Sequence, residues 1–296
     1  MSTNNKINND VGADYSSGVK IEKVFGGYFS DQKNIDDFIR IGIKPILEKL
    51  KNKNKITVAD FGGGAGNLAE GVKSFLKQHF ETADMVVIDA NPDYLNKAQE
   101  KNLDTIEANL LEYYDIEKYD LIIQRAVLHY NEDTQKQKKL LENIKKSLKQ
   151  DGFFISQLST GSKENCNMRN EIVNQVGLLP AGGRRTHLWV SPEEYTDLLS
   201  QVGFQNNKIA GFAKSGSWTI TEMWNRFNKN IESEVFSKND MDEISRYNER
   251  KKAFFSNSVK IINKYLDASD KETLMIEQKG KDFTISYQYP IFVSSN

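Results

Sequence analysis

Residues 56–66 read ITVADFGGGAG and give the clearest indication of the fold class. A short apolar run over residues 56–61 is followed at once by four glycines among five residues. Residues 68–80 then repeat apolar side chains at helical spacing. Glycine tolerates positive φ and lets backbone N–H groups approach a ligand closely, so this strand, loop and helix together predict a ligand-binding turn.

Outward from this turn, strand-like and helix-like segments alternate. Strands are expected at residues 85–88, 104–108, 119–124 and 153–158, and helices at 94–101 and 134–150. This rhythm predicts a doubly wound α/β domain with a largely parallel sheet. Residues 204–212 and 283–293 are expected as two further strands.

The flanking segments suggest three parts. Residues 1–24 are polar and are expected to form a flexible N-terminal arm. Asp31 opens an amphipathic helix that runs to Leu50. Residues 214–272 are mostly helical in pattern and read as an insertion. The core domain is then residues 25–213 plus 273–296.

Composition excludes several classes. Among 296 residues, Lys plus Arg is 40 and Asp plus Glu is 41, which argues against a strongly basic nucleic-acid binder. One cysteine, Cys166, and three histidines predict neither a disulfide framework nor a metal site. The sequence contains no long apolar run and no signal-like start, so we expect a cytoplasmic protein without a membrane segment.

Polar residues recur where strands end. Asp60 lies two residues before Gly62, and Asp89 ends the second strand. A carboxylate at that second position can accept both hydroxyls of a ribose. Asn109 and Arg125 follow the third and fourth strands.

VADFGGGAG (residues 58–66), Asp89, Asn109 and DLIIQRAVLHY (residues 120–130) together resemble the class I S-adenosylmethionine-dependent methyltransferases. The resemblance covers residues 25–213 and the last strand. It implies a seven-stranded Rossmann-like sheet whose last strand is antiparallel. It also implies S-adenosylmethionine as cofactor and S-adenosylhomocysteine as product.

The resemblance also implies roles for particular residues. Asp89 would hold the ribose, and Asn109 would face the adenine amino group, although the family often has Asp there. The other cofactor contacts that it implies are Tyr28, Asp60, Gly62, Gly64, Gly66, Ala90, Leu110, Gln124, Arg125 and Ala126.

Other interpretations of the glycine loop remain open. Gly64, Gly66 and Ala69 also satisfy G-x-G-x-x-A, a pattern of nicotinamide and flavin enzymes. That pattern usually lacks a preceding Asp, so Asp60 favours the methyltransferase. Glycines that serve only packing are the third alternative.

Two histidines are candidate catalytic residues. His129 follows Arg125 by four residues, and its ordinary pKa of about 6.5 suits a general base at neutral pH. The alternative is a histidine that packs against the next helix. His187, in GGRRTHLWV, is the second candidate.

The acceptor is expected to lie near the loops that follow the strands. Arg184 and Arg185 could grip a carboxylate or phosphate. The other acceptor residues that we expect are Gln157, Trp189, Trp218, Met223 and Trp224. The last three would belong to a helical lid, and the alternative for them is ordinary packing.

These observations predict methyl transfer to a small molecule, with O- or N-methylation of a secondary-metabolite intermediate favoured. Neither nucleic acid nor membrane is an expected partner, and a homodimer is left open. Methylation of RNA or protein, and cofactor binding without turnover, are the alternatives.

Overall fold

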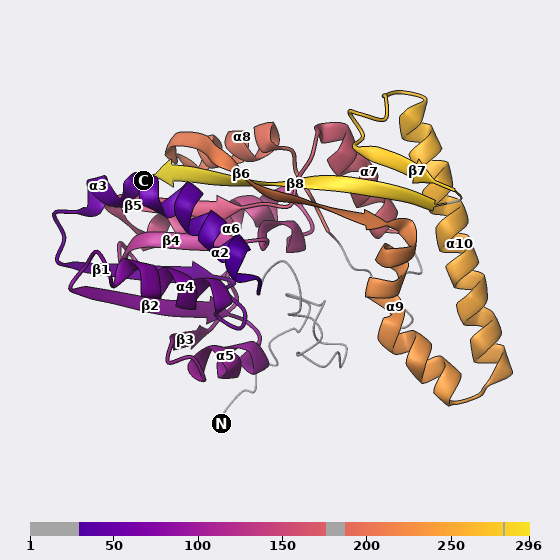
Figure 1. The fold of residues 1–296 in the computed structure, drawn as a ribbon, viewed down its shortest axis with the longest axis horizontal. Coiled ribbons are helices and arrows are strands. Elements are labelled where there is room, and N and C mark those ends of the chain that lie inside the picture. Colours follow the sequence, from indigo (N-terminus) through magenta and orange to yellow (C-terminus); the bar gives the residue numbers. More distant parts are fainter. Residues whose placement is uncertain (1–29, 176–186, 281) are drawn as a thin grey trace.

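The computed structural model describes residues 30–175, 187–280 and 282–296, and these ranges form one mixed sheet flanked by helices (Figure 1). The strand order is β3-β2-β1-β4-β5-β8-β6, and β7 pairs with β8 outside this path. The strands are β1 (Lys55–Phe61), β2 (Thr82–Asp89), β3 (Asp104–Glu107), β4 (Tyr119–Arg125), β5 (Leu148–Gln157), β6 (Gln205–Thr219), β7 (Ile276–Lys279) and β8 (Asp282–Ser295).

The sheet confirms the predicted Rossmann-like fold. Strands β1 to β5 pair in parallel, and β8 lies antiparallel between β5 and β6. β7 makes the described sheet eight-stranded rather than seven-stranded. The carboxyl ends of the parallel strands share one edge, which brings the loops after β1, β2, β3, β4 and β5 together.

The helices follow the alternation that the sequence predicts. They are α2 (Gln32–Phe38), α3 (Leu47–Leu50), α4 (Asn67–Leu76), α5 (Pro92–Gln99), α6 (Thr134–Ser147), α7 (Lys163–Val173), α8 (Pro192–Val202), α9 (Ile220–Ser237) and α10 (Met241–Leu266). Ser191 caps α8 in a capping box with Glu194, as its Ser-Pro start indicates.

The first helix differs from its prediction. Asp31 caps it by accepting a hydrogen bond from the Lys33 N–H at 2.9 Å. However, the helix does not continue regularly to Leu50, because a π-helical turn (Ile39–Ile43) and a 3-10 turn (Lys44–Ile46) interrupt it. Pro45 sits in the second turn and has no N–H to donate, so the α-helical hydrogen bonds cannot run through it.

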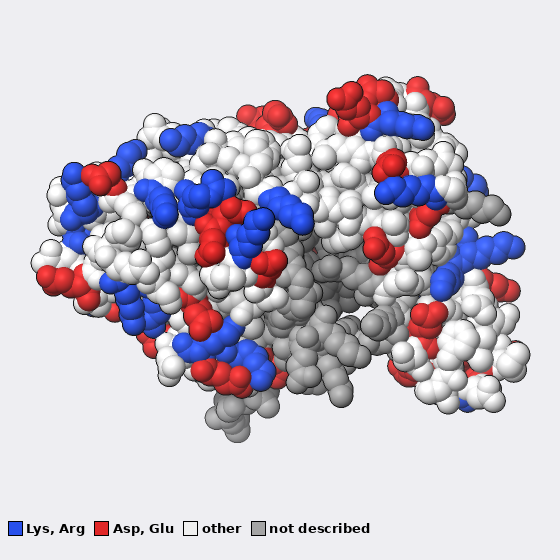
Figure 2. Space-filling model, viewed as in Figure 1, with Lys and Arg blue, Asp and Glu red and all other residues white. Residues whose placement is uncertain are grey.

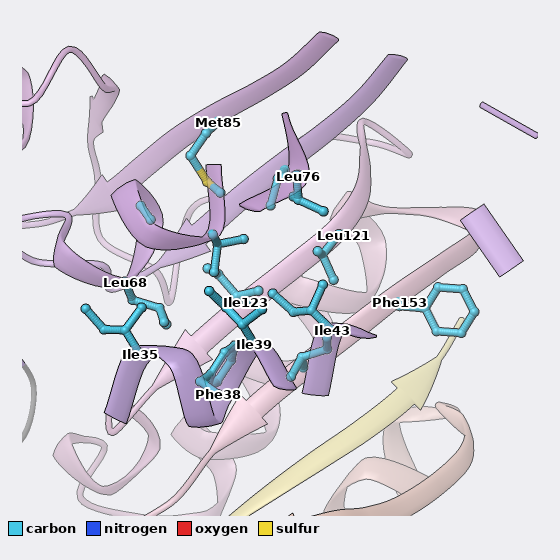
Figure 3. Packing of buried hydrophobic residues seen from close by; sticks show 14 of the residues in the cluster. Ile35, Phe38, Ile39, Ile43, Leu68, Leu76, Met85, Leu121, Ile123 and Phe153 are labelled. Atoms are coloured by element: carbon cyan, nitrogen blue, oxygen red, sulfur yellow. The ribbon is translucent and has the colours of Figure 1, made fainter. Parts of the chain in front are cut away.

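Two apolar layers hold the helices to the sheet. Figure 3 shows Ile35 and Phe38 of the first helix near Leu68 of α4 and Ile123 of β4. Side chains alternate along a strand, so Val58 faces this layer while Ala59 belongs to the second layer, which includes residues of α6 and α8. Burial of these side chains supplies most of the stability of the core.

Beyond the parallel strands, β6 and β8 form a long antiparallel ladder that carries a helical extension (Figure 1). β6 continues to Thr219, past the predicted end at residue 212, because its pairing with β8 continues to Thr284. Helices α9 and α10 with β7 form what we call the wing. Its apolar core includes residues of α7, and the Trp224 Nε1–H donates to the Tyr247 hydroxyl at 2.9 Å within it.

The amino-terminal edge of the sheet holds a buried ionic cluster. Asp120 of β4 accepts hydrogen bonds from Lys53 at 2.8 Å, from Lys149 at 2.9 Å and from the Thr57 N–H at 2.9 Å. Burial would raise the pKa of Asp120, but these donors outweigh it and hold the pKa at about 2. The cluster ties β1, β4 and β5 together on the edge opposite the glycine loop.

The surface carries charges of both signs. On the face shown in Figure 2, Lys and Arg side chains are interspersed with Asp and Glu. No helix in the described ranges combines the length and apolar character that a bilayer crossing needs.

Candidate functional site

The glycine loop connects β1 to α4 in a left-handed conformation. Gly62, Gly64 and Gly66 have φ values of +78°, +55° and +74°, which glycine adopts without strain. A Cβ on Gly66 would lie 2.6 Å from Leu103 Cδ1, whereas a Cβ on Gly64 would meet its nearest heavy atom, in Tyr94, only at 3.8 Å. Gly66 therefore serves close packing, and Gly64 leaves room beside the loop.

Asp89, at the end of β2, holds this loop in place. Its Oδ2 accepts from the Gly64 N–H and its Oδ1 from the Asn91 N–H, both at 2.9 Å. Burial raises the pKa of Asp89, and these backbone donors oppose the rise. Each carboxylate oxygen keeps a further lone pair, so Asp89 can also accept from a ligand.

Asp60 is almost wholly buried under the loop, at 1% exposure. Its Oδ2 has no hydrogen-bond partner in the described part of the chain. Burial raises its pKa to about 7, Arg125 opposes the rise, and Asp89 adds to it. A buried carboxylate with an unused oxygen indicates a missing donor or cation.

The end of β3 offers an amide and an apolar contact. Asn109 Oδ1 accepts from the Leu111 N–H at 3.0 Å, and its Nδ2 donates to Glu112 at 3.5 Å. Leu110 is buried beside it, and Ala90, after β2, is half-buried. The Asn109 oxygen still has a lone pair for an amino hydrogen.

The end of β4 contains a buried amide without a partner in the described ranges. Gln124 is 1% exposed, and neither its Oε1 nor its Nε2 has a partner among the described residues. Ala126 follows Arg125 with φ of +57°, and its N–H donates to the Gln157 carbonyl oxygen at 2.9 Å. This strained turn brings the ends of β4 and β5 together.

These residues fit the cofactor that the resemblance implies. The open side of Gly64, the unused Asp60 oxygen and the unsatisfied Gln124 amide all lie along the carboxyl edge of β1 and β4. Asp89 and Asn109 stand at the ends of the next two strands. The structure therefore groups the predicted cofactor residues from residue 60 to residue 126, whereas Tyr28 lies outside the described residues.

His129 lies in an aromatic stack beyond β4. Its ring is 4.2 Å from Tyr130 and 5.3 Å from Trp189, centroid to centroid, and nearly parallel to Trp189 at 14°. The His187 ring stacks on His129 at 5.7 Å and on Trp189 at 5.1 Å, centroid to centroid. The two candidate histidines are therefore neighbours.

Paired amide contacts with α7 fix the segment that carries His187 and Trp189. Asn170 accepts from the Trp189 N–H at 2.7 Å and donates to its carbonyl at 2.9 Å. Asn174, one turn later, bonds His187 in the same way at 2.8 and 2.6 Å. The Leu188 N–H donates to the His129 carbonyl at 3.0 Å, so the stack is anchored from both sides.

The remaining acceptor candidates lie in different parts of the fold. Trp218 lies on β6 against Tyr287, at 5.1 Å between ring centroids. Met223 and Trp224 are 1% exposed in the apolar core of the wing. Gln157 is buried at the end of β5. Arg184 and Arg185 lie outside the described residues.

The sequence reasoning missed Arg169. It is fully buried on α7, its Nη2 donates to the Ser159 hydroxyl at 3.0 Å, and its guanidinium lies 4.4 Å from the centre of the Trp189 ring. One signal was present, because Arg169 follows Cys166 and precedes Ile172 at three-residue steps. A charge on the apolar face of an amphipathic helix is unusual enough to suggest a role.

Comparison of the sequence with known proteins finds a family match and a relative. A family model described as a methyltransferase domain matches residues 32–209. A hybrid PKS-NRPS synthetase, opdA, of Penicillium oxalicum is 22% identical in an alignment of 192 residues that covers 58% of this chain but only 4% of that relative.

Solved structures agree in fold. The YcgJ protein of Bacillus subtilis matches with a TM-score of 0.55 and 17% identity, over 85% of this chain and 96% of that one. A SAM-dependent methyltransferase from Archaeoglobus fulgidus matches with a TM-score of 0.50 and 13% identity, over 94% of this chain and all of that one. At such identities the likeness shows the fold alone.

Proposed function

The chain belongs to the class I S-adenosylmethionine-dependent methyltransferases, since the family's methyltransferase domain matches more than half of it, and from that premise we propose that it methylates a small molecule. One observation carries this proposal. His129, Tyr130, His187 and Trp189 form a compact aromatic group just beyond the β4 end. Such a group suits an acceptor enclosed among aromatic side chains better than an extended macromolecular surface.

We assign the cofactor contacts to the strand ends. Asp89 accepts from the ribose hydroxyls, Asn109 from the adenine amino group, and Gln124 and Ala126 lie along the methionine part. The cofactor supplies a methyl group activated by a sulfonium charge. Asp60 and Gln124 have buried side-chain atoms without a partner in the described ranges, which supports this assignment because bound donors and acceptors would satisfy them.

His129 is proposed as the general base. Methylation of a hydroxyl or amine releases one proton, which an imidazole nitrogen of His129 takes to become imidazolium. The nearly parallel Trp189 ring presents its π face to that cation. The hydrogen bond between Leu188 and the His129 backbone keeps the ring beside the β4 end.

We propose that the wing acts as a lid and that the setting is secondary metabolism. Trp218 and the aromatic residues of β8 lie where the ladder passes from the core towards the wing, which supports a lid that borders the acceptor. The likeness to part of a PKS-NRPS synthetase supports the metabolic setting. O- or N-methylation fits a histidine base.

The direct test is calorimetry of the purified protein with S-adenosylhomocysteine, with NAD as control. We expect one-to-one binding of S-adenosylhomocysteine at micromolar affinity or better and no heat with NAD. Binding of NAD alone would favour an oxidoreductase. Tight binding without methyl transfer to any acceptor would favour a non-catalytic protein, and acceptor binding that falls steeply with salt would favour RNA.

The His129 assignment has its own test. We expect His129→Ala to lower kcat roughly 100-fold or more, with the Kd for S-adenosylhomocysteine unchanged, because general bases contribute on that scale. The matched control is His79→Ala, since His79 is exposed at the far end of α4. Equal turnover in the two variants would remove His129 as base.

A further inference from the structure

Arg169 is a buried charge that has no acidic partner among the residues that the structure describes. It has no exposed surface, and within the described ranges its one hydrogen bond runs from Nη2 to the Ser159 hydroxyl. Nε and Nη1 have no partner in the described part of the chain, and no carboxylate there pairs with the guanidinium. Burial lowers the pKa of Arg169, but from a value so high that the group stays charged at neutral pH.

Aromatic rings, rather than acids, surround this charge. The Cζ atom lies 4.4 Å from the centre of the Trp189 ring and 5.0 Å from that of Tyr287. Ring faces offset part of the lost hydration of a cation, but the N–H donors in the guanidinium plane remain unused. The Trp189 Nε1–H is a further buried donor without a partner among the described residues.

These donors lie at the edge of the sheet where the reaction is proposed. Ser159 follows β5 by two residues, and Gln157 of β5 accepts from the Ala126 N–H. Trp189 touches Arg169 on one side and stacks on His129 at 5.3 Å. A single aromatic residue therefore links the unused charge to the proposed base.

We propose that Arg169, together with the Trp189 Nε1–H, binds a carboxylate of the methyl acceptor. This inference rests on the proposed function and names its substrate class. A carboxylate is planar and matches the guanidinium fork, and its single negative charge balances the single buried cation. The guanidinium withdraws electron density from the oxygens that it binds, so the carboxylate anchors the acceptor and a different atom receives the methyl group.

A purely structural arginine would behave differently in a stability measurement. An uncompensated buried charge destabilises the folded protein, so its replacement by an apolar side chain of similar size should not lower the melting temperature. We expect Arg169→Met to melt at or above the temperature of the wild type. An arginine that holds the fold together would instead give a lower melting temperature.

The binding test uses the indole N–H signals of the three tryptophans in a proton–nitrogen NMR spectrum. The protein is saturated with S-adenosylhomocysteine and titrated with benzoate or with benzamide, which has the same shape without the charge. The Trp189 signal is identified by its loss in Trp189→Phe. We expect benzoate to shift it saturably and benzamide to leave it in place.

Variants assign the effect to the guanidinium. Arg169→Met should weaken the benzoate response at least tenfold while S-adenosylhomocysteine affinity stays unchanged. Arg169→Lys keeps the charge but not the planar guanidinium. Its benzoate response should lie between those of the wild type and Arg169→Met. Arg40→Met is the matched control, because Arg40 is largely exposed on the first helix and pairs with Asp37.

The outcomes separate the two proposals. Failure to bind S-adenosylhomocysteine would overturn the proposed function. Normal S-adenosylhomocysteine binding with equal responses to benzoate and benzamide, or with no response to either, would overturn only the carboxylate site. A benzoate response that survives in Arg169→Met, or an Arg169→Met protein that does not fold, would also overturn it.

Discussion

At the scale of the residue, burial of Asp60 under the glycine loop disfavours the charged form of its carboxyl group. Its folded pKa of about 7 exceeds the ordinary value of 3.8, so between these pH values the unfolded chain binds fewer protons than the folded one. The free energy of unfolding therefore falls as pH rises through this window. A shift of this size corresponds to about 4 kcal/mol.

Asp60→Asn should remove that fall, because the amide does not ionise. We expect the stability of the wild type relative to Asp60→Asn to decrease by roughly 2–4 kcal/mol between about pH 4 and about pH 8. Urea denaturation of both proteins without ligand at the two pH values measures it. A constant difference between them would show that Asp60 titrates normally.

Asp89 is expected to contribute to binding. Asp89→Ala removes the ribose acceptor and the partner of the Gly64 N–H, so the affinity for S-adenosylhomocysteine should fall by about 1–3 kcal/mol, or roughly 5- to 150-fold in Kd. Asp84→Ala is the control, since Asp84 lies on the same strand in an exposed ion pair with Lys55. Calorimetry should separate the two variants, and equal Kd values would contradict the assignment.

Residue identities were predictable where a motif carried them. Asp60, Asp89 and Asn109 could be placed from the glycine loop and the strand ends, because spacing along alternating strands fixes which residues share an edge. Arg169 could not be placed, since its neighbours Trp189 and Tyr287 come from distant parts of the chain. Only the tertiary packing shows that its charge faces aromatic rings and meets no carboxylate in the described part of the chain.

At the scale of the element, two glycines of the loop between β1 and α4 have different roles. Gly66 contributes to stability through close packing, and we expect Gly64 to contribute to ligand binding. Gly64→Ala places a Cβ at ordinary van der Waals distance from Tyr94 without a clash, at a conformational cost of about 1–2 kcal/mol for the left-handed residue. Gly66→Ala adds a clash with Leu103, which costs about 1–3 kcal/mol more.

We therefore expect Gly64→Ala to fold with a modestly lower melting temperature and to bind S-adenosylhomocysteine at least tenfold more weakly. Gly66→Ala should lose clearly more stability. Thermal unfolding and calorimetry of both proteins provide the comparison. A folded Gly64→Ala protein with wild-type affinity would show that the loop does not contact the ligand.

Element boundaries were predictable only where local signals fixed them. The start of α8 can be read from the sequence Ser191-Pro192-Glu193-Glu194, because the capping hydrogen bonds are local. The first helix was predicted as continuous, although Pro45 and the π-helical turn divide it. The length of β6 was underestimated, since its last residues are strand only by pairing with β8.

At the scale of the whole molecule, the wing and the acceptor side share α7. The helix contributes Met168 and Ile172 to the apolar core of the wing, and its Asn170 and its C-cap Asn174 hold the segment beside His129. The sequence indicated helices in the wing region, but their packing against α7 is a long-range contact that local periodicity does not report.

Tyr247→Phe tests how firmly the wing is held. It leaves the buried Trp224 Nε1–H without its acceptor, so stability should fall by about 1–3 kcal/mol while the affinity for S-adenosylhomocysteine stays unchanged. Tyr114→Phe, at an exposed site, should change stability by less than about 0.5 kcal/mol. Equal urea denaturation curves would show that this hydrogen bond does not stabilise the wing.

The central place of β8 has a consequence for biosynthesis. Among the described strands, β6 and β7 pair only with β8, yet β8 is translated after both. At ordinary elongation rates β6 therefore emerges from the ribosome seconds before its partner. During that interval its backbone donors and acceptors lack their strand partner, so we expect nascent chains stalled before residue 282 to be clients of chaperones and proteases.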